Sequence, residues 1–306
     1  MRSTNFALES ANVSEGPEDP PKLPVRERPT RYKGGRHRRP LPAILPPDAP
    51  ALVIAVPGKT GDGGEGTDHR VAEEIASIIR IDNPQLDLRL VSLADGGAEL
   101  VKQFAAIAAE RALADGKPAA VVVPLVTAPH PRLMRAIRDA VGQSEIPVKI
   151  TEPLGPHPLL AEALHVRLSE AGLARADRMR LFNVSSPVDG IIVATAGGDE
   201  AARGADATAV LLAARLTLPV VPAAIDGVPT IQDAADRLRK IGANRLAVAP
   251  FIVGPEADLE RVASAAEAIG AGCAAPLGAH ESVARMICVR YGATLDDLAE
   301  YDDLSE

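Results

Sequence analysis

The chain has 306 residues, of which 46% are hydrophobic, and this is enough for two ordinary domains with separate cores. Aromatic residues make up 2% of the chain and Trp is absent, so the side chains on which bases or sugar rings stack are scarce. The formal net charge of -8 gives no reason to expect nucleic-acid binding. The N-terminal sequence lacks the apolar run of a signal peptide, and no stretch of the sequence is apolar enough to span a bilayer. We therefore expect a cytoplasmic protein that does not enter a membrane.

Residues 1–50 are rich in Pro, Arg and charge and poor in large apolar side chains, which is typical of a disordered tail. The basic cluster at 36–40 fits either a solvated tail or a segment with an anionic partner. At the other end of the chain, Cys273 and Cys288 are too far apart for a Cys-x-x-Cys site. They indicate buried free thiols in a reducing compartment.

Beyond residue 50 the sequence alternates between short apolar runs and segments with helical periodicity. The run at 51–56 predicts a buried strand, and apolar residues on one stripe predict a helix over 69–81. Apolar strands alternating with helices indicate parallel sheets covered by helices on both faces. The other predicted strands are 86–92, 119–124, 147–151, 190–194, 219–225 and 246–250. The other predicted helices are 97–114, 131–142, 158–172, 199–216, 230–242 and 256–269.

One phrase occurs twice in the chain. Residues 153–157 read Pro-Leu-Gly-Pro-His, and residues 276–280 read Pro-Leu-Gly-Ala-His, an offset of 123 (280 minus 157). The match continues downstream and pairs Arg167 with Arg290. A repeat this long predicts a duplicated domain, here an α/β protein of two similar lobes. We expect a tail (1–50), the first lobe (51–173), a linker (174–189), the second lobe (190–292) and an acidic C-terminal tail (293–306).

Ligands of open parallel sheets bind beyond the carboxyl ends of the strands, so the candidate ligand-binding residues lie in the loops that follow the strands. The loop after the first strand contains Gly-Lys-Thr, but a phosphate-binding loop needs Gly five residues earlier, where this chain has Val53. Nucleotide binding is therefore not predicted. The same loop carries potential metal ligands, and the alternative is a solvated loop that leads into a helix. These residues are Asp62, Glu65, Asp68 and His69.

His130 follows the third strand and lies between two prolines. A neutral imidazole there could ligate a transition metal or accept a proton, whereas the alternative is a residue at the N-cap of the next helix. Arg132 and Arg135 come just after it and could bind the carboxylates of an anionic substrate. Glu152 ends the fourth strand and, if the two strands are neighbours, could complete a metal site or act as a base beside His130. Its alternative is an exposed charge at a strand end.

The second lobe does not repeat these candidates. Ala275 stands where the first lobe has Glu152, and the loop after residue 250 contains no His. We therefore expect a working site mainly in the first lobe. His157 and His280 are equivalent in the two copies, which favours a local structural role for both, and His165 is expected at a helix surface or boundary.

These segments, in this order, resemble the sirohydrochlorin chelatase family, the class II chelatases that insert cobalt, iron or nickel into tetrapyrroles. The resemblance covers nearly all of residues 51–291. The family usually has His-Gly after its first strand, where this chain has Pro57-Gly58, and it places its next His about two residues later than His130. The motifs that carry the resemblance are the apolar segments at 121–125 and 249–254 and the Pro-Leu-Gly phrases at 152–160 and 276–280.

The resemblance implies a chelatase that inserts a divalent metal into sirohydrochlorin, with the metal as substrate and no organic cofactor. It implies a tetrapyrrole bound between two lobes, metal ligands from His130, His69 and Glu152, and His130 and Glu152 as catalytic residues. Because the lobe is duplicated within one chain, we expect a monomer. The alternatives are a catalytically impaired relative that binds metal or tetrapyrrole as a carrier or sensor, and an interaction scaffold without a ligand.

Overall fold

The structure is a computed structural model that describes most of the chain beyond residue 44. The predicted N-terminal tail up to residue 44, the candidate ligands Asp62, Glu65 and Asp68, and most of the predicted linker lie outside the described residues. The described residues are 45, 48–58, 69–110, 117–175, 186–254 and 256–305.

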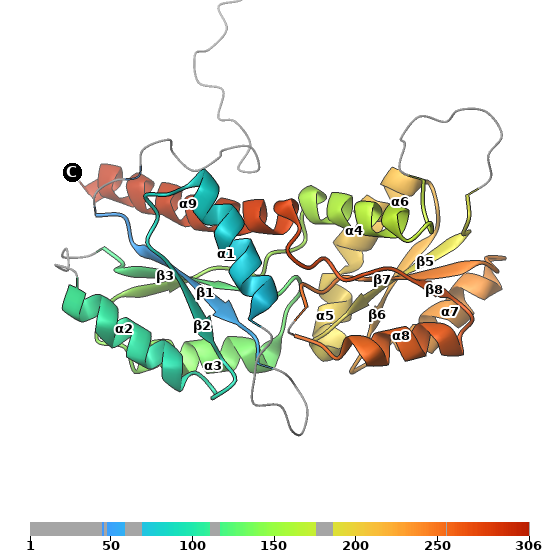
Figure 1. The fold of residues 1–306 in the computed structure, drawn as a ribbon, viewed down its shortest axis with the longest axis horizontal. Coiled ribbons are helices and arrows are strands. Elements are labelled where there is room, and N and C mark those ends of the chain that lie inside the picture. Colours follow the sequence, from blue (N-terminus) through green and yellow to red (C-terminus); the bar gives the residue numbers. More distant parts are fainter. Residues whose placement is uncertain are drawn as a thin grey trace, which may run out of the picture. The chain divides into compact units, whose positions relative to one another are not determined.

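The first lobe is built on a parallel four-stranded sheet with the order β2-β1-β3-β4 (Figure 1). The central strands β1 and β3 are buried along their whole length, which explains why their sequences are apolar at every position. The strands are β1 (Ala51–Val56), β2 (Leu88–Ser92), β3 (Ala120–Pro124) and β4 (Val148–Ile150). The helices between them are α1 (Arg70–Asp82), α2 (Ala98–Glu110) and α3 (Pro131–Gly142).

The second lobe repeats this topology with a parallel sheet of order β6-β5-β7-β8. The two orders are equivalent strand by strand, so the predicted α/β fold with two duplicated lobes is confirmed. The strands are β5 (Gly190–Thr195), β6 (Val220–Ala224), β7 (Leu246–Pro250) and β8 (Gly272–Cys273). The helices are α5 (Gly198–Gly204), α6 (Asp206–Leu216), α7 (Ile231–Lys240) and α8 (Leu259–Ala268).

The single helix predicted over 199–216 is wrong, because the structure divides it into α5 and α6 at Ala205. The N–H of Ala205 donates to the carbonyls of both Ala201 and Ala202, a tightened turn that ends α5. Gly204, a weak helix former, immediately precedes this turn. The sequence periodicity continues across the break, which is why it predicted one helix.

Two helices cross from one lobe to the other. Helix α4 (Pro158–Glu170) follows the last strand of the first sheet but packs against α6 and β7 of the second lobe. Helix α9 (Glu281–Ser305) follows the last strand of the second sheet but packs against α1 and β3 of the first lobe. The two crossing helices also pack against each other (Figure 1). One continuous core therefore extends over residues of both sheets.

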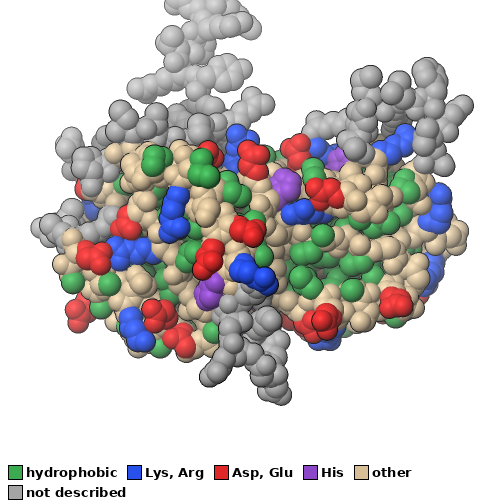
Figure 2. Space-filling model, viewed as in Figure 1, with side chains coloured by type: hydrophobic (Ala, Val, Ile, Leu, Met, Phe, Trp, Pro, Cys, Tyr) green, Lys and Arg blue, Asp and Glu red, His purple; other side chains and the backbone are tan. Residues whose placement is uncertain are grey.

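Helix α9 continues through 293–305, the range that the sequence predicted as an acidic tail. None of the helices in the described ranges combines the length and the apolar composition needed to cross a membrane. Acidic and basic side chains are interspersed over the described part of the face drawn in Figure 2.

The repeated Pro-Leu-Gly phrase forms a reciprocal contact between the lobes. The Arg167 guanidinium on α4 donates to the carbonyl of Leu277 at 2.7 Å, and the Arg290 guanidinium on α9 donates to the carbonyl of Leu154 at 3.2 Å. Donors and acceptors are both related by the repeat offset of 123 residues, since 167 plus 123 is 290 and 154 plus 123 is 277. Each copy of the phrase thus accepts hydrogen bonds from the arginine of the other copy.

Gly155 of the first phrase lies where the lobes come closest. A Cβ atom at this position would lie 2.5 Å from the Thr127 carbonyl oxygen and 2.9 Å from the Phe251 ring. The Thr127 hydroxyl donates to the Phe251 carbonyl at 2.5 Å, across the same boundary. Only glycine fits here without displacing these neighbours.

Replacement of Arg290 should weaken this interface. Arg290→Ala leaves the carbonyls of Leu154 and Gly155 without their donor, so we expect the free energy of unfolding to fall by about 1–3 kcal/mol in urea denaturation. Arg285 is exposed on the same helix and its side chain makes no hydrogen bond or ion pair with the described residues, so it supplies the control Arg285→Ala, which should change stability little. Equal stability of the two variants would contradict the role given to Arg290.

Candidate functional site

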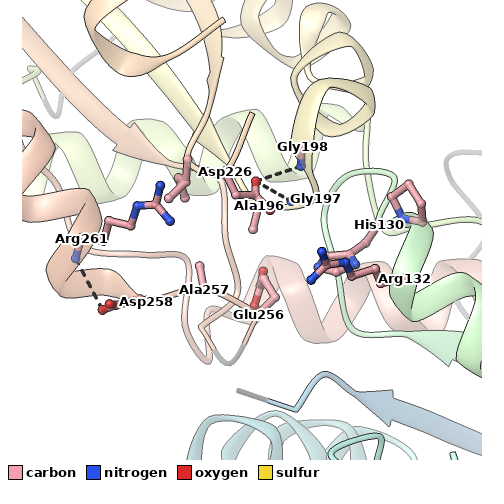
Figure 3. A pocket seen from close by; sticks show the side chains of 12 residues that line it. His130, Arg132, Ala196, Gly197, Gly198, Asp226, Glu256, Ala257, Asp258 and Arg261 are labelled. Carbon is pink, nitrogen blue, oxygen red and sulfur yellow. Dashed lines mark hydrogen bonds between the residues drawn. The ribbon is translucent and has the colours of Figure 1, made fainter. Parts of the chain in front are cut away.

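A pocket of about 410 Å³ lies between the lobes. The first lobe contributes the start of α3, and the second lobe contributes the loops that follow β5, β6 and β7 (Figure 3). These are carboxyl ends of parallel strands, the place where ligands of such sheets bind. The ionisable side chains that line it are His130, Arg132, Asp226, Glu256, Asp258 and Arg261.

His130 caps helix α3 and also faces this pocket. Its Nδ1 atom accepts a hydrogen bond from the N–H of Leu133 at 3.4 Å, and Pro131 occupies the first helical position. The N-cap arrangement that the sequence offered as the alternative is therefore present. Burial lowers the pKa of His130, whereas the Asp226 carboxylate of the second lobe raises it and Arg132 lowers it. The imidazole is accordingly neutral at pH 7.

Two glycines, Gly197 before α5 and Gly204 at its end, pack against the segment that carries His130. A Cβ atom on Gly197 would lie 2.6 Å from the Pro129 carbonyl oxygen and 3.2 Å from the His130 Cα. A Cβ atom on Gly204 would lie 2.4 Å from the Pro129 ring. The backbone of the second lobe therefore touches the residue before His130, and this contact holds the imidazole at the boundary of the lobes.

The structure does not bring the three predicted metal ligands together. Within the described ranges, no three His, Cys, Asp or Glu side chains form a group able to hold a metal ion. His69 is the residue before α1, and its side chain makes no capping hydrogen bond. Strands β3 and β4 are neighbours as expected, but Glu152 is exposed. Its charge raises the pKa of Arg290, which burial lowers.

The predicted arginines differ in position. Arg132 lines the pocket, whereas Arg135 lies one turn further along α3, exposed and outside the pocket lining. Arg261, on α8 of the second lobe, lines the pocket and was missed. Its neighbours in the sequence gave no signal, because only the packing of the lobes brings α8 to the pocket that α3 enters.

Glu256 was also missed, although the duplication could have found it. Strands β3 and β7 end at Pro124 and Pro250, and six residues further each lobe has His130 or Glu256 (124 plus 6, 250 plus 6). Equivalent positions of the two lobes therefore line one pocket.

The Glu256 side chain is 4% exposed and closes the loop after β7. Its two carboxyl oxygens accept hydrogen bonds from the N–H groups of Val253 at 2.5 Å and Gly254 at 2.8 Å. Burial raises its pKa to about 7, although these N–H groups act in the opposite direction. A carboxyl group that changes charge near neutral pH therefore lies in the pocket wall.

Three further histidines of the described ranges, His157, His165 and His280, make hydrogen bonds within the fold. His157 and His280 each accept a hydrogen bond at Nδ1 from the backbone of the following helix, at 3.1 Å from Leu159 and 3.0 Å from Ser282. Their expected local role is what the structure shows. His165 is buried rather than at a helix surface, because Arg215 on α6 donates to its Nδ1 at 2.9 Å.

The contact between Gly204 and Pro129 can be tested by adding one methyl group. Gly204→Ala places a Cβ against a rigid proline ring, so we expect a loss of about 1–3 kcal/mol in the free energy of unfolding despite the better helix propensity of Ala. Gly142→Ala, at the end of α3 in open space, should be neutral or gain up to about 1 kcal/mol. The assignment fails if Gly204→Ala is as stable as the parent chain in thermal and urea unfolding.

The raised pKa of Glu256 predicts a pH dependence of stability. The folded chain binds a proton more tightly than the unfolded chain, so this stabilisation is present below the unfolded pKa of 4.5 and is lost as pH rises through about 7. The corresponding change in the free energy of unfolding is up to about 3 kcal/mol. Urea denaturation between pH 5 and 8 should show the difference between the parent chain and Glu256→Gln shrinking or reversing as pH rises. A pH-independent difference would contradict this role of burial.

Three solved structures share this fold. SirB from Bacillus subtilis with Fe3+ superposes with a TM-score of 0.58 at 13% identity, covering 81% of this chain and 97% of SirB. The sirohydrochlorin chelatase SirB from Bacillus subtilis subspecies spizizenii in complex with cobalt gives a TM-score of 0.53 at 13% identity, covering 81% and 96%. CbiX, the terminal enzyme for biosynthesis of siroheme in denitrifying bacteria, gives 0.52 at 19% identity, covering 78% and 96%.

No family model and no curated protein matches the sequence. The likeness to SirB and CbiX therefore concerns the fold, and it extends over nearly the whole length of both relatives. Together with the equivalent sheets of the two lobes, it gives this chain the class II fold of the sirohydrochlorin chelatases.

Proposed function

We propose that this chain binds a tetrapyrrole between its lobes and inserts a divalent metal ion, cobalt or iron, into it. The observation that carries the proposal is a neutral, half-buried imidazole, His130, at a pocket of about 410 Å³ to which both lobes of a chelatase fold contribute. The names of the relatives supply the substrate class, a sirohydrochlorin, and the two metals. The metal is a substrate of the reaction, and the proposal needs no organic cofactor.

The chemistry requires a group that accepts protons. Two pyrrole N–H protons must leave as the metal–nitrogen bonds form; a neutral imidazole near the ring can accept one of them, and the other passes to water. The Nδ1 atom of His130 accepts the capping hydrogen bond at 3.4 Å, so the neutral imidazole carries its proton on Nε2. Nδ1 is therefore the nitrogen with the lone pair, and it takes a proton or binds the metal by releasing the Leu133 N–H. Burial favours this function because it keeps His130 unprotonated at pH 7, and a protonated imidazole cannot ligate.

The other predicted site residues fit the proposed function to different degrees. His69 stays a candidate second ligand, since it lies directly before α1, at the end of the loop that follows β1. Glu152 is a weaker candidate because its charge acts on Arg290. Arg132 is proposed to contact the substrate, since its guanidinium lines the pocket.

Binding without insertion is the second candidate function. It is favoured by one observation, namely that the described residues contain no group of three side chains able to hold a metal ion. A chain of this kind would bind the tetrapyrrole or the metal as a carrier or sensor and would not accelerate insertion.

The test mixes the protein anaerobically with sirohydrochlorin and Co2+ and follows metal insertion by the change in absorbance. The rate of insertion is compared with the rate without protein. His130→Asn is the informative variant, because Asn still caps a helix but has no imidazole. We expect it to reduce the catalysed rate by about 100-fold or more, the usual contribution of a general base. His280→Asn is the matched control, because His280 makes the same kind of capping bond in the second lobe and should be dispensable for the rate.

The outcomes separate the candidates. Acceleration that His130→Asn loses and His280→Asn keeps supports the chelatase. A spectral shift of the ring without acceleration supports the carrier. If the protein causes no spectral shift and no acceleration, both functions are contradicted.

A further inference from the structure

The carboxylates in the pocket are already occupied by backbone N–H groups. Asp226 accepts from the N–H groups of Gly197 at 3.2 Å and Gly198 at 2.8 Å, which ties the loop after β6 to the start of α5. Asp258 accepts from the first turn of α8, as its N-cap residue. Glu256 accepts from the loop after β7, as described above. All three acids therefore stabilise the loops that form the pocket.

The two guanidinium groups in the pocket have no such partner. Arg132 and Arg261 make no side-chain hydrogen bond or ion pair within the described part of the chain, and both are exposed. Other arginines of the chain do pair with carboxylates, as Arg89 does with Asp87 and Arg215 does with Glu162. The two guanidinium groups are therefore the side chains of the pocket that can still pair with an anionic group of a ligand.

The position of Arg132 strengthens this interpretation. It lies in the first turn of α3, where the helix dipole disfavours a cation, and this turn contains no acidic residue to offset it. A positive charge left unpaired in such a place lowers the stability of the free chain. A bound anion would remove that cost.

We infer that Arg132 of the first lobe and Arg261 of the second lobe bind two carboxylates of one ligand across the pocket. Figure 3 shows the two guanidinium groups entering the pocket from opposite sides. Each planar guanidinium can hold one carboxylate through two parallel hydrogen bonds, so the pair selects a ligand with acidic groups on two of its edges. This inference rests on the proposed function and adds Arg261 as a residue that determines specificity.

A ligand held in this way connects the two lobes. The first lobe would contribute the imidazole of His130 and one guanidinium, and the second lobe would contribute the other guanidinium. Because both arginines are exposed, salt should weaken the binding by screening.

The experiment measures the binding of metal-free uroporphyrin, which carries eight carboxylates, by fluorescence at low and high NaCl. Arg132→Ala and Arg261→Ala should each raise Kd about tenfold or more at low salt, and less at high salt. Arg138→Ala on α3 and Arg237→Ala on α7 are the controls, since both side chains are exposed and outside the pocket. They should leave Kd within about twofold of the parent value.

Each result either supports or overturns the inference. If the parent chain binds uroporphyrin and Arg261→Ala binds it equally well, the inferred binding of two carboxylates by Arg132 and Arg261 is overturned while the proposed function stands. If the parent chain binds no uroporphyrin, the proposed function fails with it. If inorganic phosphate weakens uroporphyrin binding no more than NaCl of the same ionic strength does, recognition of the uroporphyrin carboxylates by the two arginines is supported. If phosphate alone binds tightly and uroporphyrin does not, the pocket is a site for small anions and the inference is overturned.

Discussion

The exchange of helices α4 and α9 between the lobes is the constraint on which the rest of this structure depends. Each helix leaves the last strand of one sheet and completes the hydrophobic cover of the other, so neither sheet is buried by its own repeat alone. The reciprocal bonds from Arg167 and Arg290 fix the position of this exchange against the repeated phrase. Because the core is shared, the loops at the pocket cannot move far apart without exposing apolar surface to water.

The same packing places the candidate site. The contact of Gly197 and Gly204 with Pro129 brings the second lobe against the residue that precedes His130. An imidazole that would otherwise cap a surface helix becomes half-buried, and its pKa falls for that reason. The chemical character of His130 is thus a property of the interface between the lobes, and the α3 sequence alone does not determine it.

Duplication followed by divergence explains the asymmetry of the pocket. Equivalent loop positions carry His130 in one lobe and Glu256 in the other, and both line the same space. The acid is tied to its own loop by two backbone N–H groups, whereas the imidazole accepts one capping bond, at 3.4 Å. The two loops therefore contribute a structural group from the second lobe and a candidate reactive group from the first.

The sequence by itself determined most of the strands and helices, the parallel sheets and the equivalence of the lobes, but it missed strand β8 and the division of 199–216 into two helices. Apolar runs and helical periodicity are local signals, and the repeated phrase is visible without coordinates. The sequence also singled out His130 and Arg132, which both line the pocket. It could not show that Glu152 acts on Arg290, or that Arg261 lies at the same pocket as His130. Those relations join residues more than a hundred positions apart, and only the crossing of the two helices brings them together.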